Sequence, residues 1–483
     1  MRTIHCIALA ATLLAAACAA PPPEPFGPVP SSSQLAWQRM ETNMFCHFGP
    51  NTFSGAEWGS GDEAEDMFNP ASIDCGQWVD VAAEAGFGGI IVTAKHHDGF
   101  CLWPSGQSAH TVAQSRWTEG KGDVLRLLRD AIDAHNGSQA ACGRKVRMGV
   151  YISPWDRNHP AYGTDTYNQV FANTLREVHS QYGPMFEQWF DGACGEGPGG
   201  KRQVYDWPMF MQTVADLNPQ CVVFSDIGPG CRWVGNEEGR AGTTCWSTLR
   251  TDGATPSENK PAPDELVTGH RDGDKWVPAE VDVSLRPGWF WHPGEEPKTV
   301  EQLVDIYLTS VGRNGLLLLN VPPDTNGRIC AADSARLVAW RAEIDRIFAR
   351  DLAGGATARG RHLRGRRYSA QNALDTAYHT YWAAADSVAS VTIDFGSEAT
   401  FDLVVLQEYI PLGQRVCRVE LHCQEADGHW MPALPDDAPL CTTVGYKRIV
   451  SLPSAVTARR VRLDFVGLAA PVINRIAFYN SAQ

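Results

Sequence analysis

Ionisable and aromatic side chains follow several short apolar runs in the first half of the chain. His47 follows "MFC", the pair His96–His97 follows "IIVTAK", and Tyr151 lies within "GVYIS". Asp191 comes directly after "EQWF", so that a charge ends an otherwise apolar run. Imidazole and phenol groups exchange hydrogen bonds with hydroxyls, and a carboxylate can act as a nucleophile or as an acid–base group. Together these residue types suit a pocket for a polyhydroxylated ligand.

Each of these features also has an explanation that involves no ligand. An aspartate before a glycine often forms a turn, so Asp191–Gly192 can simply close a strand. Adjacent histidines commonly include one that is bonded to a backbone carbonyl, and the 16 tryptophans can fill a core. The functional interpretation is favoured because a single fold would explain all of the positions at once.

The elements that must position these residues alternate between buried strands and amphipathic helices from about residue 40 to residue 350. We predict a first strand that ends with His47 and further strands at 86–94, 144–153, 185–190, 221–226 and 315–321. We predict helices at 123–136, 166–183, 206–218 and 332–350. Such alternation predicts a parallel sheet that is covered on both faces. The length and the absence of a GxGxxG motif favour a (β/α)8-like TIM barrel over a doubly wound sheet. The carboxyl ends of barrel strands meet at one face, where active sites form.

The pattern changes after residue 350. Residues 351–367 are rich in small and basic side chains and are predicted to be a linker. Residues 368–483 then alternate with period two between turn signals, which predicts a β-sandwich of the galactose-binding-like kind. The predicted organisation is therefore an α/β barrel over 34–350, a linker, and a C-terminal sandwich.

The N-terminus has the pattern of an export signal. Residues 1–20 combine Arg2 with an apolar run that ends in small residues. Two outcomes remain open, namely a lipoprotein with Cys18 lipidated, at the periplasm or the cell surface, or a freely secreted protein. Residues 21–33 are rich in Pro and Ser and are predicted to be an extended tether. We expect membrane contact only through a lipid anchor.

Composition excludes several classes of partner. The 483 residues carry a net charge of −14, and no basic stripe is present, which argues against binding to nucleic acid. The 14 cysteines form no CxxC pair, so a zinc ribbon is not expected. Pairing of Cys221 with Cys231, or within the group Cys417, Cys423 and Cys441, stays open. We expect no cofactor and no metal.

Several motifs carry a resemblance to a known family. They are "HFGPNTF", "TAKHHDGFCLWPS", "GVYISPWDR", "WFDGA", "SDIGPGCRWVGNEEG", "SLRPGWF" and "LLLLNVPPDTNG". In this order they resemble the α-L-fucosidases of glycoside hydrolase family 29 over nearly the whole chain that follows the signal. "QEYIPLGQRVCRVEL" is similar to the C-terminal β-domain of that family. The stretch "RWVGNE" resembles the subgroup that acts on α-1,3- and α-1,4-linked fucose of Lewis-type glycans.

The resemblance implies roles for particular residues. A retaining glycosidase uses two carboxyl groups about 5–5.5 Å apart. Similarity to the family motif makes Asp191 the nucleophile and Glu237 the acid/base, with Glu280 and the adjacent Glu238 as rivals. The implied substrates are fucosylated oligosaccharides or glycoconjugate glycans. The residues expected to bind the sugar are His47, Glu57, Trp58, His96, His97, Tyr151, Trp189 and Trp289. Lys95, Asp98, Trp155, Asp156 and Arg232 are expected either near the sugar or as supports of the site.

Two other functions remain as alternatives. A metal-dependent barrel hydrolase would use His47, His96, His97 and Asp191 as ligands. Zinc sites of that type commonly use alternate strand residues, whereas adjacent residues of a strand point to opposite sides. A non-catalytic carbohydrate-binding surface protein would use the sandwich as its binding module. The presence of both Asp191 and Glu237 argues against this second alternative.

Overall fold

The computed structural model describes residues 20–138, 144–361, 363–435 and 438–482. It divides the chain into two compact units. One unit comprises residues 28–349 with 447–449 and 482, and the other comprises residues 20–27, 350–446 and 450–481. The predicted export signal, including Cys18, falls on residues 1–19, which lie outside the described residues.

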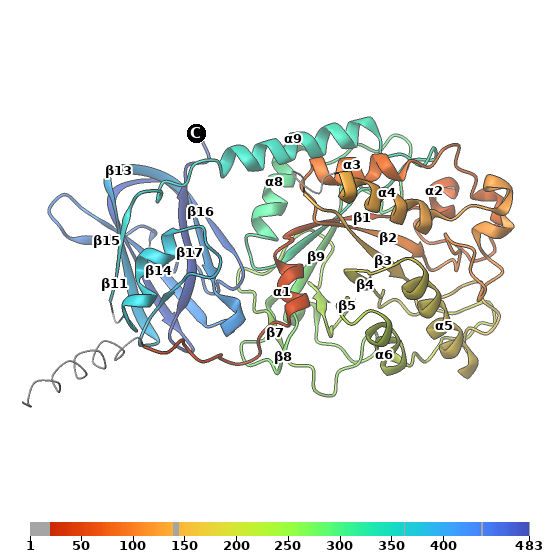
Figure 1. Ribbon diagram of the computed structural model, residues 1–483, viewed down its shortest axis with the longest axis horizontal. Coiled ribbons are helices and arrows are strands. Elements are labelled where there is room, and N and C mark those ends of the chain that lie inside the picture. The colour runs from red at the N-terminus through yellow and green to blue at the C-terminus, as the bar shows by residue number, and fades with distance from the viewer. Residues whose placement is uncertain (1–19, 139–143, 362, 436–437, 483) are drawn as a thin grey trace, which may run out of the picture. The chain divides into compact units, whose positions relative to one another are not determined.

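The first unit is a closed barrel of parallel strands (Figure 1). Around the barrel the order is β1–β10–β9–β6–β5–β4–β3–β2, which confirms the predicted TIM-like fold. The strands are β1 Thr42–Cys46, β2 Gly89–Lys95, β3 Arg147–Ile152, β4 Glu187–Trp189, β5 Val222–Ser225, β6 Cys231–Trp233, β9 Ala279–Ser284 and β10 Leu316–Asn320. A separate two-stranded sheet is formed by β7 Thr248–Leu249 and β8 Lys275–Trp276.

Helices surround the barrel strands (Figure 1). They are α1 Ser32–Gln38, α2 Pro50–Ser54, α3 Cys75–Glu84, α4 Val124–Ser138, α5 Asp165–Gln181, α6 Trp207–Leu217, α7 Pro263–Thr268, α8 Val300–Thr309 and α9 Ala331–Ile347. Capping side chains determine where several of these helices begin. Asp74 caps α3 by accepting from Gln77 N at 2.9 Å, and Asp206 caps α6 by accepting from Met209 N at 3.0 Å. Short 3₁₀ turns in this unit are η1 Glu65–Met67, η2 Val112–Gln114 and η3 Trp117–Gly120.

The barrel interior is filled by side chains that project inward from alternate strand positions. Phe45, Ile91, Tyr151, Trp189 and Leu318 belong to one buried cluster, to which β1, β2, β3, β4 and β10 each contribute. Because side chains alternate along a strand, one residue in two from each strand enters this layer. The layer forms a packed floor beneath the carboxyl ends of the strands.

Two barrel strands were not predicted from the sequence. Strand β6 has only three residues, and β9, "AEVDVS", carries carboxylates at two of its six positions. Charged residues within a short run are typical of a loop, yet all six residues of β9 are buried. Strand β9 could therefore not be predicted from an apolar pattern, because the barrel buries its carboxyl side chains.

The second unit contains an antiparallel sheet of seven strands, in agreement with the predicted β-sandwich domain. The order is β12–β17–β13–β16–β14–β15, and β11 pairs with β13. The strands are β11 Thr357–Gly360, β12 Trp382–Ala383, β13 Val388–Glu408, β14 Val416–Gln424, β15 Trp430–Pro432, β16 Arg448–Gly467 and β17 Val472–Tyr479. Short turns are η4 Arg366–Tyr368, η5 Ala370–Leu374 and η6 Ile410–Leu412. Strand β13 is long and contains both of the alternating stretches "SVTIDFG" and "FDLVVLQE".

The segment predicted as a linker contains β11, which pairs with β13 from Thr357↔Asp394 to Gly360↔Val391. Its small and basic residues suit an edge strand because the partly exposed side needs no apolar side chain. The segment predicted as a tether also differs from the expectation. Its last residues, Ser32 and Ser33, begin α1, with Ser31 and Gln34 forming a capping box.

Residues 20–27 lie on the sandwich unit, and we call them the N-terminal strap. Phe26 N donates to Leu412 O at 3.1 Å, and Arg415 Nη2 donates to Glu24 O at 2.5 Å. Arg364 Nε donates to Pro21 O at 2.9 Å. Backbone carbonyls of a Pro-rich chain are unpaired in isolation, so arginine donors can hold them. The strap is therefore bound along its length rather than extended into solvent.

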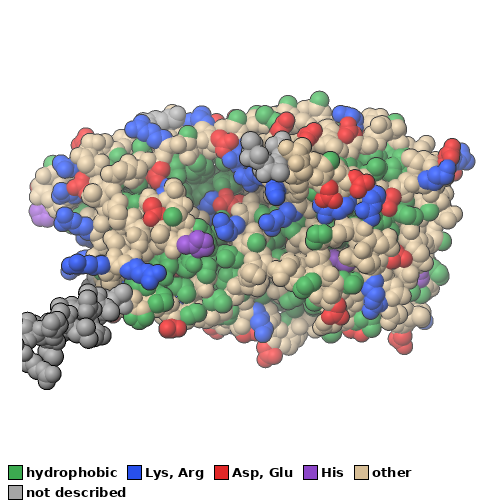
Figure 2. All heavy atoms as spheres, viewed as in Figure 1, with side chains coloured by type: hydrophobic (Ala, Val, Ile, Leu, Met, Phe, Trp, Pro, Cys, Tyr) green, Lys and Arg blue, Asp and Glu red, His purple; other side chains and the backbone are tan. Residues whose placement is uncertain are grey.

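Three further expectations from the sequence concern surface charge, cysteine pairing and membrane-spanning helices. Figure 2 shows Lys and Arg side chains interspersed with Asp and Glu over the viewed face, with no basic stripe. Cys221, Cys231, Cys417, Cys423 and Cys441 form no disulfide within the described residues, so the pairings left open from the sequence are not formed. Within the described ranges, no helix has the length and apolar character that crossing a membrane requires.

Candidate active site

A cavity of about 220 Å³ lies at the carboxyl ends of the barrel strands, and we call it the strand-end cavity. Its lining is dominated by aromatic and ionisable side chains. The lining residues are Phe45, His47, Glu57, Trp58, His96, His97, Tyr151, Trp189, Asp191, Ala193, Glu237, Asp282 and Trp289. The structure thus brings together every sugar-binding residue named from the sequence, together with Asp191 and Glu237.

Asp191 follows β4, where the chain leaves the barrel. Its Oδ2 accepts from the phenol of Tyr151 at 3.0 Å, and its Oδ1 accepts from the backbone N–H of Ala193 at 2.7 Å. His97 Nε2 lies 3.7 Å from Oδ2. The side chain keeps 26% of its exposure, so one face of the carboxylate is open to the cavity. Two donors thus fix the carboxylate in one orientation.

The three histidines are held in neutral forms. Burial lowers the pKa of His47 to about 3, that of His97 to about 4, and that of His96 well below its usual value. For His47 the charge of Asp191 and the bond to Asn320 oppose the shift without overcoming it. A neutral imidazole has one donor and one acceptor nitrogen. Each ring therefore offers directional hydrogen bonding without positive charge.

Neighbouring groups determine which nitrogen of His47 carries hydrogen. Asn320 Nδ2 donates to Ser284 Oγ and to Trp289 O, so Asn320 Oδ1 is the acceptor that lies 2.9 Å from His47 Nδ1. His47 Nδ1 consequently donates, and Nε2 is an acceptor.

The same reasoning applies to His97. Ser153 Oγ donates to Trp155 O at 3.0 Å and accepts from His97 Nδ1 at 2.8 Å. His97 Nε2 is then an acceptor, as is the nearby Asp191 Oδ2. A ligand hydroxyl can donate into the 3.7 Å gap between these two acceptors.

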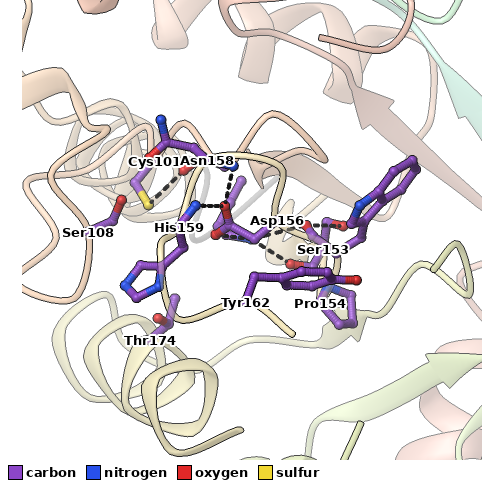
Figure 3. A network of polar contacts seen from close by, with 12 residues as sticks. Cys101, Ser108, Ser153, Pro154, Asp156, Asn158, His159, Tyr162 and Thr174 are labelled. Atoms are coloured by element: carbon purple, nitrogen blue, oxygen red, sulfur yellow. Dashed lines mark hydrogen bonds and ion pairs between the residues drawn. The ribbon is translucent and has the colours of Figure 1, made fainter. Parts of the chain in front are cut away.

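A buried ion pair supports the histidine pair from behind. Lys95 Nζ lies 3.1 Å from Asp156 Oδ2, with side chains 3% and 2% exposed. Lys95 also donates to Ser153 O at 2.8 Å, which fixes the residue that orients His97. Figure 3 shows Asp156 at the centre of its contacts, with Oδ1 accepting from the backbone N–H groups of Asn158 and His159 at 3.0 and 2.7 Å. Lys95 and Asp156 therefore act as supports, one of the two roles left open from the sequence.

Glu237 lies on the loop after β6. Its Oε2 accepts from the indole of Trp289 at 3.3 Å. The residue as a whole is exposed, yet desolvation of its carboxyl group and the charge of Asp191 raise its pKa, against the opposing bond from Trp289. Glu57 joins this wall because its Oε2 accepts from Trp289 N at 2.9 Å and its Oε1 lies 2.5 Å from His292 Nε2. A carboxyl with a raised pKa beside an open carboxylate suits proton donation.

The rivals of Glu237 lie elsewhere. Glu280 is fully buried in β9, where it accepts from the indole of Trp189 at 2.9 Å and lies beside Glu187. Glu238 is exposed and its N–H donates to Asn236 Oδ1 at 3.0 Å. Neither residue is among those that line the strand-end cavity in the described part of the chain. Burial within β9 separates Glu280 from the cavity, and on the loop it is Glu237 and not Glu238 that lines the cavity.

Three further residues that were considered from the sequence are structural. Arg232 is 0% exposed and its guanidinium donates to the carbonyls of Leu266 and Trp246, both at 3.0 Å. Trp155 donates to Glu196 O at 3.1 Å and packs 4.8 Å from the ring of His97. Asp98 is also fully buried, its Oδ1 accepting from Phe100 N at 2.6 Å. None of the three is among the described residues that line the strand-end cavity.

Asp282 lines the cavity and was not named from the sequence. It lies on β9, the strand that the sequence pattern hid, and is 3% exposed. The sequence did contain a signal for Asp282. In "EVD" the two carboxylates are two residues apart, and residues with this spacing in a strand share a face.

Among the described residues, the donor sets that could hold a metal share no member with the lining of this cavity. Within the described ranges, two groups of three have ligand atoms within 4.8 Å of one another, Glu187–Cys231–Glu280 and Glu420–His422–Asp464. Neither includes His47, His96, His97 or Asp191. The geometry therefore gives no support to the metal-dependent alternative at the strand-end cavity.

A parallel barrel whose strand ends present paired carboxyl groups, neutral imidazoles and indole rings around a sugar-sized cavity defines a barrel glycoside hydrolase. The α-L-fucosidase family matches residues 28–340, and the F5/8 type C domain matches residues 356–477. Alpha-L-fucosidase 1 of Arabidopsis thaliana is 39% identical over 450 residues, which span 92% of this chain and 85% of the plant protein.

Solved structures agree. The crystal structure of SpGH29 is 36% identical, with a TM-score of 0.87 over 95% of this chain and all (100%) of that one. A GH29 fucosidase of Ruminococcus gnavus in complex with fucose is 32% identical, with a TM-score of 0.84 over 95% and 96% of the two chains. The chain belongs to the α-L-fucosidases of glycoside hydrolase family 29.

Proposed function

We propose that the protein is an exported, retaining α-L-fucosidase that hydrolyses terminal α-1,3- and α-1,4-linked L-fucose from Lewis-type glycans. The observation that carries the mechanistic part is the arrangement of Asp191 and Glu237. Asp191 is held by Tyr151 and Ala193 with one face open, while Glu237 lines the same cavity with a raised pKa. Two carboxyl groups with different environments are what a double displacement requires.

In the first step, Asp191 attacks the anomeric carbon and Glu237 donates its proton to the departing glycosidic oxygen. The bond from carbon to the leaving oxygen breaks as the bond from carbon to Asp191 forms, which gives a covalent glycosyl-enzyme. Burial raises the pKa of the Tyr151 phenol well above its usual value, and the charge of Asp191 adds to the shift. Tyr151 therefore stays protonated and keeps Asp191 oriented while its charge decreases.

In the second step, Glu237 is a carboxylate and takes a proton from water. The oxygen of that water attacks the anomeric carbon, and the bond to Asp191 breaks. Glu237 regains its proton and Asp191 its charge, so both groups return to their starting states. Two inversions at one carbon give overall retention of configuration.

Recognition of the sugar is assigned to hydrogen-bonding and apolar groups. His47 Nε2 and His97 Nε2 are acceptors for ring hydroxyls, and Glu57, which is bonded to Trp289, adds a further acceptor. Trp189 and Trp289 line the cavity and offer apolar surface for the C–H side of the sugar and its methyl group. A volume of about 220 Å³ suits one sugar ring, which supports removal of a terminal residue.

The linkage preference is supported by the likeness of "RWVGNE" to the α-1,3/1,4 subgroup and by an exposed tryptophan at the cavity. Trp58 is 59% exposed, although it lines the cavity and packs edge-on against His97 at 5.5 Å and Trp155 at 5.6 Å. An exposed indole fixed by two rings can stack on the sugar that carries the fucose. Export is supported by the sequence pattern of residues 1–20.

Two measurements test the proposal. Time-resolved NMR of aryl α-L-fucoside hydrolysis is expected to show α-fucose as the first product, and first-formed β-fucose would overturn the double displacement. A panel of Lewis-type trisaccharides, 2′-fucosyllactose and an aryl fucoside is expected to show faster release from the Lewis-type substrates. Equal or faster release from the α-1,2-linked substrate would overturn the linkage assignment alone.

A further inference from the structure

A third carboxyl group enters the strand-end cavity, that of Asp282. The residue lies on β9 between β10 and β6, and its side chain lines the cavity together with Asp191 and Glu237. Asp282 and Glu280 are two residues apart on β9 and so project to the same side of the strand, into the barrel. The double displacement assigns no step to Asp282.

One oxygen of Asp282 has no hydrogen-bond partner. Its Oδ1 is buried and unpaired within the described part of the protein, whereas the indole of Trp233 donates to the carboxyl group. An unpaired buried polar atom costs about 1–3 kcal/mol, and such atoms are few in native proteins. Because this carboxyl borders a cavity instead of packed side chains, a bound ligand can supply the missing partner.

The surroundings of Asp282 favour its neutral form. Burial raises the pKa of Asp282 well above its usual value, and the charges of Glu237 and Asp191 add to the shift, while the bond from Trp233 opposes it. Glu280 is the other carboxyl that interacts with Asp282. The imidazoles that share the cavity, His47, His96 and His97, have lowered pKa values and carry no positive charge.

We propose that Asp282 is a substrate-binding residue, a neutral carboxylic acid that donates a hydrogen bond to a hydroxyl oxygen of the fucose ring. The proposal rests on the assignment of the strand-end cavity as the fucose site. The acceptors already described, His47 Nε2, His97 Nε2 and Glu57, take hydrogens from the sugar, whereas a protonated Asp282 gives one. A neutral donor also avoids a second negative charge beside Asp191.

The test measures L-fucose binding by isothermal titration calorimetry, which needs no turnover. Asp282→Ala is expected to weaken binding about tenfold at pH 5, which corresponds to about 1.4 kcal/mol. Asp282→Asn keeps an N–H donor and is expected to stay within about threefold of the wild type. Wild-type affinity is expected to fall as pH rises through the raised pKa of Asp282, because the donor is present only below that pKa. Asp282→Asn is expected to lose this dependence.

A matched control is Glu408→Gln in the sandwich unit. Glu408 is also a buried carboxyl, and burial raises its pKa to about 7, but it accepts from backbone N–H groups of its own unit and does not line the cavity. The control is expected to bind fucose with wild-type affinity and wild-type pH dependence.

The outcomes separate the two proposals. Absence of fucose binding by the wild type would overturn the assignment of the cavity and, with it, the role of Asp282. Undiminished binding by Asp282→Ala, with normal wild-type binding, would overturn the role of Asp282 alone. Retention of the wild-type pH dependence by Asp282→Asn would likewise overturn only the role of Asp282. If Asp282→Ala does not fold, the comparison of the wild type with Asp282→Asn decides the question.

Discussion

Strand β4 has a carboxyl group at each end, and the two behave in opposite ways. Glu187 begins the strand, is 0% exposed and accepts from the indole of Trp37 at 2.7 Å. Burial raises its pKa to about 7. Asp191 follows the other end, open to the cavity and held by a phenol and a backbone N–H. Position along the barrel axis thus decides whether a carboxyl group is a structural acid or a reacting carboxylate.

The lower end of the barrel holds a pair of acids. Glu280 also has a raised pKa, first because it is buried and then because Glu187 lies beside it. Two ionised carboxylates in this interior would repel strongly, so the pair must hold at least one proton. Glu280 accepts from Trp189, whose ring forms part of the cavity wall. The structural acids therefore hold a wall of the site without entering it.

The largest expected effect is at Asp191, which follows the cavity end of β4. Asp191→Asn keeps the shape of the side chain but removes the nucleophile, so kcat for an aryl α-L-fucoside is expected to fall by about 10⁴-fold or more. The melting temperature should stay close to that of the wild type because the amide oxygen can still accept from Tyr151 or Ala193. Near-normal turnover by a homogeneous preparation would show that the wrong carboxylate has been assigned.

The next effect separates Glu237 from its buried rival. Glu237→Ala is expected to slow a Lewis-type trisaccharide by about 10²–10⁴-fold, because its leaving group needs a proton. An activated aryl fucoside should be slowed much less in the first step, and azide should restore part of its turnover. Glu280→Gln serves as the comparison. Equal losses with both substrates in Glu237→Ala would transfer the acid role to another group.

A smaller effect, on stability, is expected at Glu187, which begins β4. Glu187→Ala leaves the indole N–H of Trp37 without its acceptor and opens a small cavity, so the free energy of unfolding should fall by about 2–3 kcal/mol. Activity per folded molecule should change little because Glu187 does not line the strand-end cavity. Denaturant unfolding combined with active-site titration measures both quantities. A large loss of kcat at unchanged stability would contradict the division between the two ends.

The smallest expected effect is on the pH dependence of stability. The folded-state pKa of Glu187 is raised from 4.5 to about 7, so its contribution is fully present below 4.5 and is lost as pH rises through 7. The free energy of unfolding should therefore decrease by about 1 kcal/mol between pH 6 and 7 from this group. Glu187→Gln should make the decrease shallower. An unchanged slope in denaturant titrations would mean that the pair does not hold its proton as described.

The barrel strands with continuous apolar runs were predictable from the sequence. Strands β2, β3 and β10 are buried over nearly their whole length, and burial on both faces selects apolar residues with short gaps. Strand β9 was not predictable by that rule because Glu280 and Asp282 interrupt it. Only tertiary structure supplies the partners of such residues, here Glu187, Trp189 and the cavity itself.

The residues of the site were likewise predictable in part. Residues at strand ends, such as His47, His97 and Asp191, could be grouped because barrel strands share one functional face. The choice between Glu237 and Glu280 could not be made, because it depends on which of the two side chains reaches the cavity in the folded barrel. The tautomers of His47 and His97 also depend on Asn320 and Ser153, which lie far away in sequence.

The N-terminal strap sets an order of events during synthesis. Glu24 and Arg415 are bonded although 391 residues separate them. At roughly 5–20 residues per second, a ribosome needs roughly 20–80 s to make the intervening chain. Until Arg415 has been made, the strap lacks this contact, although every strand of the barrel has by then been synthesised. The sandwich unit, which holds the first of the described residues, is therefore the last part of the protein able to close.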